Sequence, residues 1–307
     1  MVNGHSRKIG DVCTASKGGV TRNNTPSTQG KGKRPSTFYN IGNSCYYNAL
    51  LQCMYYTGTL SDIETGRGPL SAALRSIEQL LSHEDTVTVS PRCVKKAMGS
   101  INQRFGTNYQ EDASELFLTI IDTLSGELGS QCPISTSTRG YLTSFTQCQI
   151  CLEAITMERQ PFHLMQLSIQ NNTSCLGDCW KSNFQDTNLT DARCQFCGVV
   201  GQRVQKQTIE LPQTLVIHFK RFSFDTRATK LKTTVKAPLQ DWKPVENGPP
   251  FRLVATIDHH GESIDRGHYT ANCLLNRWWH FDDTNAQPVT STSVSSKDNY
   301  LLFYVAQ

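Results

Sequence analysis

The sequence predicts an α+β fold in which helices come first along the chain and strands follow. Apolar residues recur at helical spacing in three segments before residue 126. After residue 140 the chain instead contains short runs rich in β-branched and aromatic residues, separated by Gly, Asn and Asp turns. Helices followed by strands are typical of α+β proteins.

Residues 1–35 differ in composition from the rest. They are rich in Gly, Ser, Thr, Asn and Lys and show almost no apolar periodicity, so we predict a disordered basic tail. Residues 1–34 contain seven lysine or arginine residues and one aspartate, which leaves the remainder slightly acidic. A slightly acidic body does not favour nucleic-acid binding and suits a basic protein partner. The stretch KGKR at 31–34 is either a solvated linker or a nuclear import signal.

The helical segments can be bounded from their residue types. Asn43 or Ser44 can cap the first helix, and Gly58 ends it. The second helix covers 69–82 and points its leucines inward. The third begins near Gln110 and carries acidic residues in its first turn, where the helix dipole favours negative charge.

The strand-like part of the chain consists of several short runs. Pro212 stands between two of them, a place that suits strand entry or a sheet edge. The expected strands lie within EAITMERQPFHLMQLSI, QTIELPQTLVIHFKRFSF, FRLVATIDHHG, GHYTANCLL, RWWHFDD and NYLLFYV.

The composition argues against a membrane or secreted protein. The longest apolar runs are short and interrupted, so we expect no membrane-spanning segment. The N-terminus lacks the apolar core of a signal peptide, and Val2 stands where myristoylation needs glycine. We therefore expect the twelve cysteines to lie in the reducing cytoplasm or nucleus, where they are buried, metal-bound or catalytic rather than bridged.

Two CxxC pairs predict a metal site. Cys148 and Cys151 form the first pair, and Cys194 and Cys197 form the second. Two such pairs can make a closed tetrahedral site of four thiolates, which is the preference of structural zinc. An alternative ligand set uses Cys175, which lies between the pairs. Because no coordination position stays open, we expect Zn²⁺ to stabilise the fold rather than to take part in chemistry.

Cys45 is the candidate nucleophile. It stands where a polar loop turns into the first helix, and a helix N-terminus stabilises a thiolate. Cys53 lies two turns deeper and is expected in the core. A small buried cysteine at a helix start is the common alternative, so Cys45 needs a base and an acid elsewhere in the chain.

His268 is the best candidate base among eight histidines. It starts a strand after a polar loop, whereas His218 lies inside a strand and suits a structural role. A hairpin of fourteen residues returns the chain beside His268. We therefore expect Asp282 or Asp283 to hold the Nδ1–H of His268, as the acid of a catalytic triad does.

Taken together, these stretches resemble the ubiquitin-specific proteases, a papain-like family of deubiquitinating cysteine proteases. The resemblance covers about residues 36–306. The stretch NIGNSCYYNALLQC is similar to the family's cysteine box, YQEDASELFLTIIDTL to its Gln–Asp box, and GHYTANCLLNRWWHFDD to its histidine box. The two CxxC pairs match the zinc site at the tip of the family's fingers subdomain.

The resemblance implies a catalytic role for five residues. Cys45 is implied as the nucleophile and His268 as the base. Asp282 is implied to orient the base, with Asp283 beside it and able to replace it in part. Asn40 is implied to supply an amide to the oxyanion hole.

The resemblance also implies how ubiquitin binds. Gln110 and Asp112 are implied to lie near the cleft, with Asp112 placed to meet a basic residue of the ubiquitin tail. Tyr269 is implied to line the channel for that tail.

The implied architecture is a papain-like catalytic domain over residues 36–307. It divides into a helical thumb at 36–130, fingers with a zinc ribbon at 140–215 and a β-rich palm at 216–307. The implied activity is thiol-dependent hydrolysis of isopeptide or peptide bonds at the C-terminal glycine of ubiquitin. Two alternatives stay open: a protease of the same fold for another ubiquitin-like modifier, and a non-catalytic ubiquitin-binding scaffold. We expect a monomer with no organic cofactor.

Overall fold

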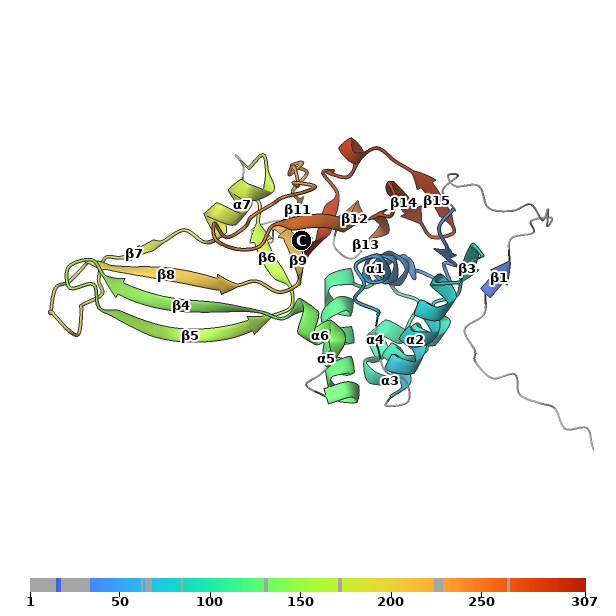
Figure 1. Ribbon diagram of the computed structural model, residues 1–307, viewed down its shortest axis with the longest axis horizontal. Helices are drawn as coiled ribbons and strands as arrows, with labels where there is room; N and C mark the ends of the chain where they lie inside the picture. Colours follow the sequence, from blue (N-terminus) through green and yellow to red (C-terminus); the bar gives the residue numbers. More distant parts are fainter. Residues whose placement is uncertain are drawn as a thin grey trace, which may run out of the picture.

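The computed structural model describes residues 34–61, 63, 68–83, 85–129, 132–170, 173–223, 229–263 and 266–307, together with a strand at 15–17. Figure 1 shows a body in which helices lie against a large sheet, and a long second sheet that extends away from the body. Among the described residues, no helix has the length and apolar character needed to cross a membrane. The predicted α+β class is confirmed.

The large sheet has seven strands in the order β15-β14-β13-β12-β16-β9-β6. The β6–β9 pair is parallel and the other pairs are antiparallel. The strands are β6 (Met165–Ser168), β9 (Thr214–Lys220), β12 (Phe251–Ser263), β13 (Arg266–Leu274), β14 (Trp278–Asp282), β15 (Asn285–Pro288) and β16 (Asn299–Ala306). Since β13 pairs with β14, with Ala271 opposite Phe281, the end of β14 returns toward the start of β13.

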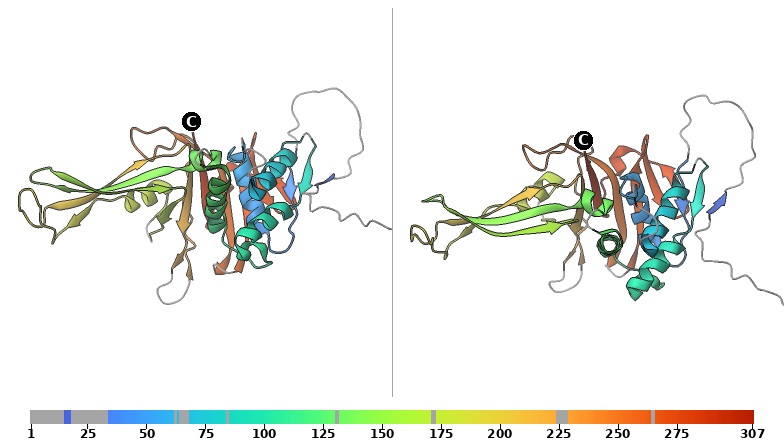
Figure 2. Two further views of the ribbon diagram at one scale, coloured as in Figure 1. Left: turned by 90° about the horizontal axis from the view of Figure 1, so that it is seen from below. Right: turned by 60° about the horizontal axis from the view of Figure 1, so that its bottom comes forward.

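Helix α1 lies between this sheet and the helices of residues 69–128 (Figures 1 and 2). Ten of its residues are buried, which explains why apolar side chains occupy nearly all of its surface. The helices are α1 (Cys45–Tyr56), α2 (Pro69–Leu81), α3 (Arg92–Ile101), α4 (Gln103–Gly106), α5 (Ala113–Leu128), α6 (Pro133–Thr138) and α7 (Leu176–Asn183). Helices α3, α4 and α6 were not predicted: α4 and α6 have only four and six residues, and α3 buries four of its ten residues.

The start of the third predicted helix is corrected by the structure. Helix α5 begins at Ala113 rather than near Gln110. The Asp112 carboxylate accepts hydrogen bonds from the backbone N–H groups of Ser114 (2.7 Å) and Glu115 (2.9 Å), so it caps the helix instead of lying within it.

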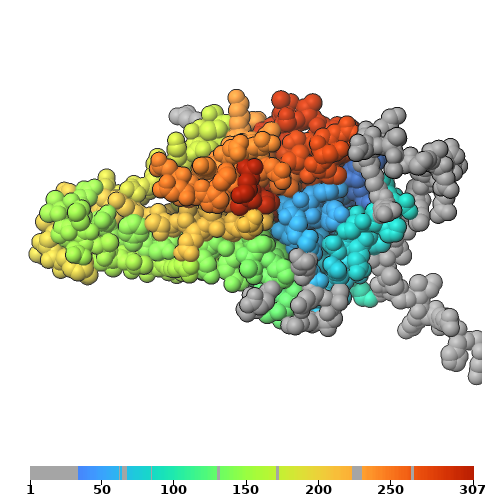
Figure 3. Space-filling model, viewed as in Figure 1, coloured from blue at the N-terminus to red at the C-terminus, as the bar shows by residue number. Residues whose placement is uncertain are grey.

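The second sheet has four antiparallel strands in the order β5-β4-β8-β7. They are β4 (Gly140–Cys148), β5 (Ala154–Phe162), β7 (Thr187–Leu189) and β8 (Arg203–Glu210). This sheet projects from the body in Figure 3 and falls within the range predicted for the fingers. Strand β6 falls in the same range but pairs with β9 in the large sheet.

Short elements complete the structure. They are β1 (Ala15–Lys17), β2 (Thr37–Phe38) and β3 (Val87–Val89), which form a small sheet, the pair β10 (Phe222–Ser223) and β11 (Thr229–Lys230), and a 3₁₀ helix (Ser291–Ser293). Most described cysteines are free, as expected, but Cys93 is disulfide-bonded, which corrects the expectation for that residue. The rest of the predicted tail lies outside the described residues.

Candidate active site

The loop 40–44 delivers Cys45 to the start of α1. Gly42 has a φ of +104°, in the left-handed region that glycine adopts without steric cost. The side-chain oxygen of Asn40 accepts hydrogen bonds from the N–H groups of Gly42 (3.1 Å) and Ser44 (3.2 Å), which closes the turn. Ser44, one of the two predicted capping residues, occupies the N-cap position of α1. Its hydroxyl, however, makes no capping hydrogen bond to the helix. The first-turn N–H groups of α1 are therefore left uncapped by that side chain.

Cys45, His268 and Asp282 lie next to one another. Cys45 is 2 % exposed on the first turn of α1. The pKa of His268 is raised to about 9. The largest cause is a hydrogen bond to Cys45; the contact with Asp282 also raises the pKa, and burial lowers it. Asp282 Oδ1 lies 2.6 Å from His268 Nε2. The protonated imidazole is thus stabilised between a thiol and a carboxylate.

The ring nitrogen that meets the acid differs from the prediction. We expected Nδ1–H of His268 to face the carboxylate, but Nε2 does so. Since Nε2 is engaged with Asp282, Nδ1 is the nitrogen left for Cys45. The choice of nitrogen depends on the rotation of the ring about its side-chain bonds, and the hairpin length alone does not determine that rotation.

Asp283 contacts two asparagine amides. Its carboxylate accepts hydrogen bonds from Asn40 Nδ2 (2.8 Å) and Asn48 Nδ2 (2.7 Å). Asp283 has a φ of +49°, which turns its side chain away from the direction that strand alternation would give. Asn48 was not predicted as a site residue, although it lies one turn after Cys45 on the predicted helix and therefore on the same face. Asp283 thus orients the Asn40 amide and keeps it beside the start of α1.

Gln110 joins the loop before α5 to the loop before His268. Its side-chain amide donates to the Gly267 carbonyl and accepts from the Gly267 N–H (2.8 Å), and Nε2 also lies 3.8 Å from Cys45 Sγ. Gly267 has no room for a side chain, because a Cβ there would lie 2.3 Å from His259 Nε2. Gln110 therefore holds the two catalytic segments at a fixed separation.

Asp112 and Tyr269 lie at the start of α5. The Tyr300 hydroxyl donates to the Asp112 carboxylate, whose other oxygen caps α5. Tyr269 is 3 % exposed and packs against the His259 ring, with ring centroids 4.7 Å apart. Burial raises the pKa of Tyr269, and a backbone hydrogen bond from Ala113 ties its hydroxyl to the helix start. The structure places Tyr269 near Cys45 and Asp112 at the start of α5, and their contact with a substrate stays a prediction.

The four cysteines of the CxxC pairs meet at the far end of the second sheet. The Sγ atoms of Cys148 and Cys197 are 3.7 Å apart, as are those of Cys151 and Cys194. A regular tetrahedron with Zn–S bonds of about 2.3 Å separates its sulfur atoms by about 3.8 Å. Backbone N–H groups, first that of Cys197, lower the pKa of Cys194 to about 6. The four residues can hold a metal ion, and Cys175 is not part of the group.

Comparisons with known proteins agree with this geometry. The family model described as "Ubiquitin carboxyl-terminal hydrolase" matches residues 37–304. Mouse ubiquitin carboxyl-terminal hydrolase 17-like protein B is 28 % identical over 303 residues, covering 87 % of this chain and 63 % of its own length. Human ubiquitin carboxyl-terminal hydrolase 2 is 26 % identical over 353 residues, covering 93 % of this chain and 58 % of its own length. The chain thus spans between half and two thirds of these relatives.

A solved structure shows the same fold. It is titled as the SAGA Ubp8/Sgf11/Sus1/Sgf73 DUB module bound to ubiquitin aldehyde. A chain of that module superposes with a TM-score of 0.74 at 23 % identity, covering 89 % of this chain and 69 % of its own length. With the family model matched over almost all of the described residues, this chain belongs to the ubiquitin carboxyl-terminal hydrolase family, as a ubiquitin-specific protease.

Proposed function

We propose that the chain is a thiol-dependent deubiquitinase, which hydrolyses isopeptide or peptide bonds at the C-terminal glycine of ubiquitin. The observation that carries the proposal is the contact of Cys45 with His268, whose second nitrogen lies 2.6 Å from Asp282. This is the nucleophile, base and orienting acid of a cysteine protease. Family membership supplies ubiquitin as the substrate class.

The reaction begins with a proton transfer inside the site. Because the pKa of His268 is raised to about 9, the imidazole can take the Cys45 proton near neutral pH. The thiolate then attacks the glycine carbonyl carbon. The carbonyl oxygen becomes an oxyanion, which the Asn40 amide and the uncapped N–H groups of α1 can bind, at about 3 kcal/mol for each donor.

The second half returns the proton and releases ubiquitin. His268 donates its proton to the leaving lysine amine as the tetrahedral species collapses to a thioester on Cys45. Water, deprotonated by His268, then attacks the thioester carbonyl and frees the thiol. Asp282 keeps the imidazole turned toward Cys45 through both proton transfers.

Substrate binding is proposed for three further residues. We assign Gln110, Asp112 and Tyr269 to the channel that receives the ubiquitin tail. Gln110 is the best supported of the three, because its Nε2 reaches both Cys45 and Gly267. Ubiquitin or a ubiquitinated protein is the expected partner; a monomeric state and a cytoplasmic or nuclear location stay predictions.

We also propose that the metal held by the four cysteines is Zn²⁺. All four donors are sulfur, two Sγ pairs are 3.7 Å apart and the four Sγ atoms lie within 4.8 Å of one another, which suits zinc. When bound, zinc would cross-link the two CxxC turns at one end of the second sheet. No catalytic step passes through this group, since the cysteines lie at the end of the sheet farthest from the helices (Figure 1).

The test is hydrolysis of ubiquitin that carries a fluorogenic amide at its C-terminus. The wild type should release the fluorophore, and Cys45→Ala and His268→Ala should not. Cys175→Ala, which removes a partly exposed thiol outside the site, is the matched control and should keep full activity. Activity that persists in Cys45→Ala would overturn the proposal.

A further inference from the structure

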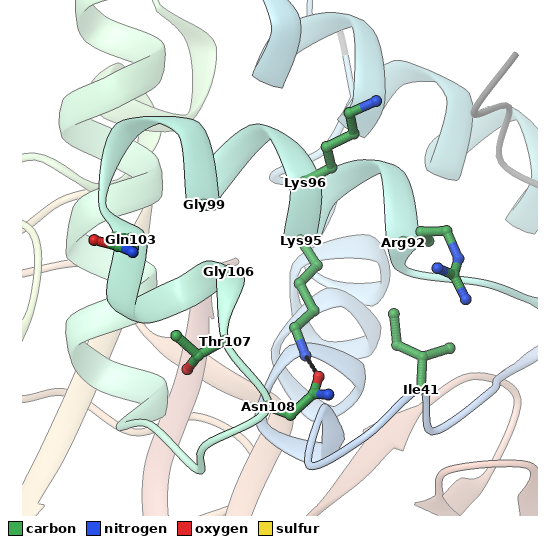
Figure 4. A pocket seen from close by; sticks show the side chains of 9 residues that line it. All are labelled: Ile41, Arg92, Lys95, Lys96, Gly99, Gln103, Gly106, Thr107 and Asn108. Carbon is green, nitrogen blue, oxygen red and sulfur yellow. Dashed lines mark hydrogen bonds between the residues drawn. The ribbon is translucent and has the colours of Figure 1, made fainter.

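A cavity lies beside the loop that precedes Cys45. It has a volume of about 520 Å³, is open to solvent and is lined by residues of α3, α4 and the segments around Ile41 and Asn108. Figure 4 shows these side chains around the opening. The volume is in the range of sites for small molecules. Neither the proposed reaction nor the predicted zinc site uses this cavity.

The cavity is strongly basic. Arg92, Lys95 and Lys96 line it, and none of its lining residues is acidic. Within the described parts of the chain, Arg92 has no carboxylate in ion-pair distance. Lys95 is 6 % exposed, and burial, followed by the charge of Arg92, lowers its pKa. An anion in the cavity would offset the clustered positive charge. It would therefore reduce both the repulsion between Arg92 and Lys95 and the cost of burying the Lys95 ammonium.

One wall of the cavity consists of backbone. A Cβ atom on Gly99 would lie 2.6 Å from Gly106 Cα, so only glycine lets α3 and α4 meet there. The two glycines therefore bring the backbones of α3 and α4 into direct contact, and both residues line the cavity. Thr107 and Gln103 add neutral hydrogen-bonding groups to the same wall.

Lys95 connects the cavity to the loop before Cys45. Its Nζ donates to the Gly42 carbonyl (3.1 Å) and to Asn108 Oδ1 (3.1 Å). Asn43 Nδ2 donates to the Asn108 carbonyl (2.8 Å), so Lys95 holds one residue of the loop directly and Asn108 holds another. An ammonium has three N–H donors, and the two bonds leave one for a ligand.

We propose that this cavity binds a small phosphate-bearing molecule and that the bound phosphate stabilises the loop 40–44 through Lys95. The phosphate would accept hydrogen bonds from the Arg92 guanidinium and from the third N–H of Lys95. Arginine suits this role because its planar fork matches two phosphate oxygens. The organic part of the ligand would contact Ile41.

The test is binding of inorganic pyrophosphate to the full chain, measured by calorimetry at constant ionic strength. The wild type should bind with a dissociation constant below about 1 mM. Arg92→Glu should weaken binding by at least about tenfold, the value of one hydrogen bond to a charged group. Arg252→Glu is the matched control, because Arg252 is exposed on β12 and does not line the cavity, and it should bind like the wild type.

The effect on the loop is measured by hydrogen exchange. The N–H groups of residues 41, 42 and 44 bond to side chains of the same loop, so their exchange reports its opening. Pyrophosphate should slow this exchange by at least about threefold in the wild type and leave Arg92→Glu unchanged. These readouts need no catalysis, so they separate failure of this proposal from failure of the proposed function.

Three results would overturn the proposal. One is the absence of saturable binding to folded protein. Another is equal weakening in Arg92→Glu and Arg252→Glu, which would indicate general attraction of anions to a charged surface. The third is tighter binding of a phosphoserine peptide than of pyrophosphate, which would assign the cavity to a phosphorylated protein instead of a small molecule.

Discussion

Replacing Asp283 with asparagine tests how the structure orients the oxyanion-hole amide. The carboxylate accepts one hydrogen bond from Asn40 (2.8 Å) and one from Asn48 (2.7 Å). Asparagine has the same shape and tolerates the φ of +49° at this position. Its side chain, however, has a single oxygen, so its NH₂ group must face one of the two donor amides.

The size of the effect follows from these contacts. A hydrogen bond to a charged group contributes about 1.5–3 kcal/mol, and loss of one oxyanion donor lowers kcat about 10²- to 10³-fold. Asn40 still accepts two backbone hydrogen bonds through its oxygen, which limits its movement. We therefore expect Asp283→Asn to lower kcat by about 10- to 100-fold and to change KM by less than about twofold.

The assay is steady-state hydrolysis of the fluorogenic ubiquitin amide. Asp186→Asn is the matched control, since Asp186 lies next to β7 in the second sheet and is 57 % exposed. The role of Asp283 in orienting Asn40 is disproved if kcat of Asp283→Asn equals that of the wild type. It is also refuted if the loss appears in KM alone, because an oxyanion contact acts on the transition state.

Three further predictions concern pH, metal and packing. Since the pKa of His268 is raised to about 9, the rate of hydrolysis should fall as pH rises through about 9. Asp282→Ala should move the midpoint of this fall to lower pH, because Asp282 helps to raise the pKa. An unmoved midpoint would contradict the assignment of Asp282 as the acid that partners His268. Cys151→Ser should lower Tm and abolish the rise in Tm on adding zinc, measured by calorimetry; a retained zinc response would contradict the four-thiolate site. Gly267→Ala should cost about 1–3 kcal/mol in urea unfolding, because its Cβ would overlap His259, and unchanged stability would disprove the tight contact.

The sequence predicted the site where chemistry restricts residue type. A helix-borne Cys45, a strand-borne His268 and an acid fourteen residues later formed a pattern, and the structure brings these residues together. The CxxC spacing likewise predicted which four cysteines meet. In each case a short local motif and one hairpin or ribbon were enough to predict which residues come together.

Contacts that depend on side-chain rotation or on distant segments could not be predicted. The ring nitrogen of His268 that faces Asp282 is one example. The pairing of Asp283 with Asn40 and Asn48 is another, because it joins segments that lie 243 and 235 residues apart and needs a left-handed residue at 283. Helix α4 has four residues, too few for a periodic pattern, so the cavity beside it was not predicted either.

The most direct test of the account is reaction of the purified, zinc-loaded protein with ubiquitin that carries a C-terminal electrophile. We expect a covalent adduct heavier by one ubiquitin, with the bond mapped to Cys45 by peptide mass spectrometry, and no adduct with Cys45→Ala. An adduct on another cysteine, or none from folded wild-type protein, would contradict the claim that Cys45 is an activated thiol in a site shaped for the ubiquitin tail.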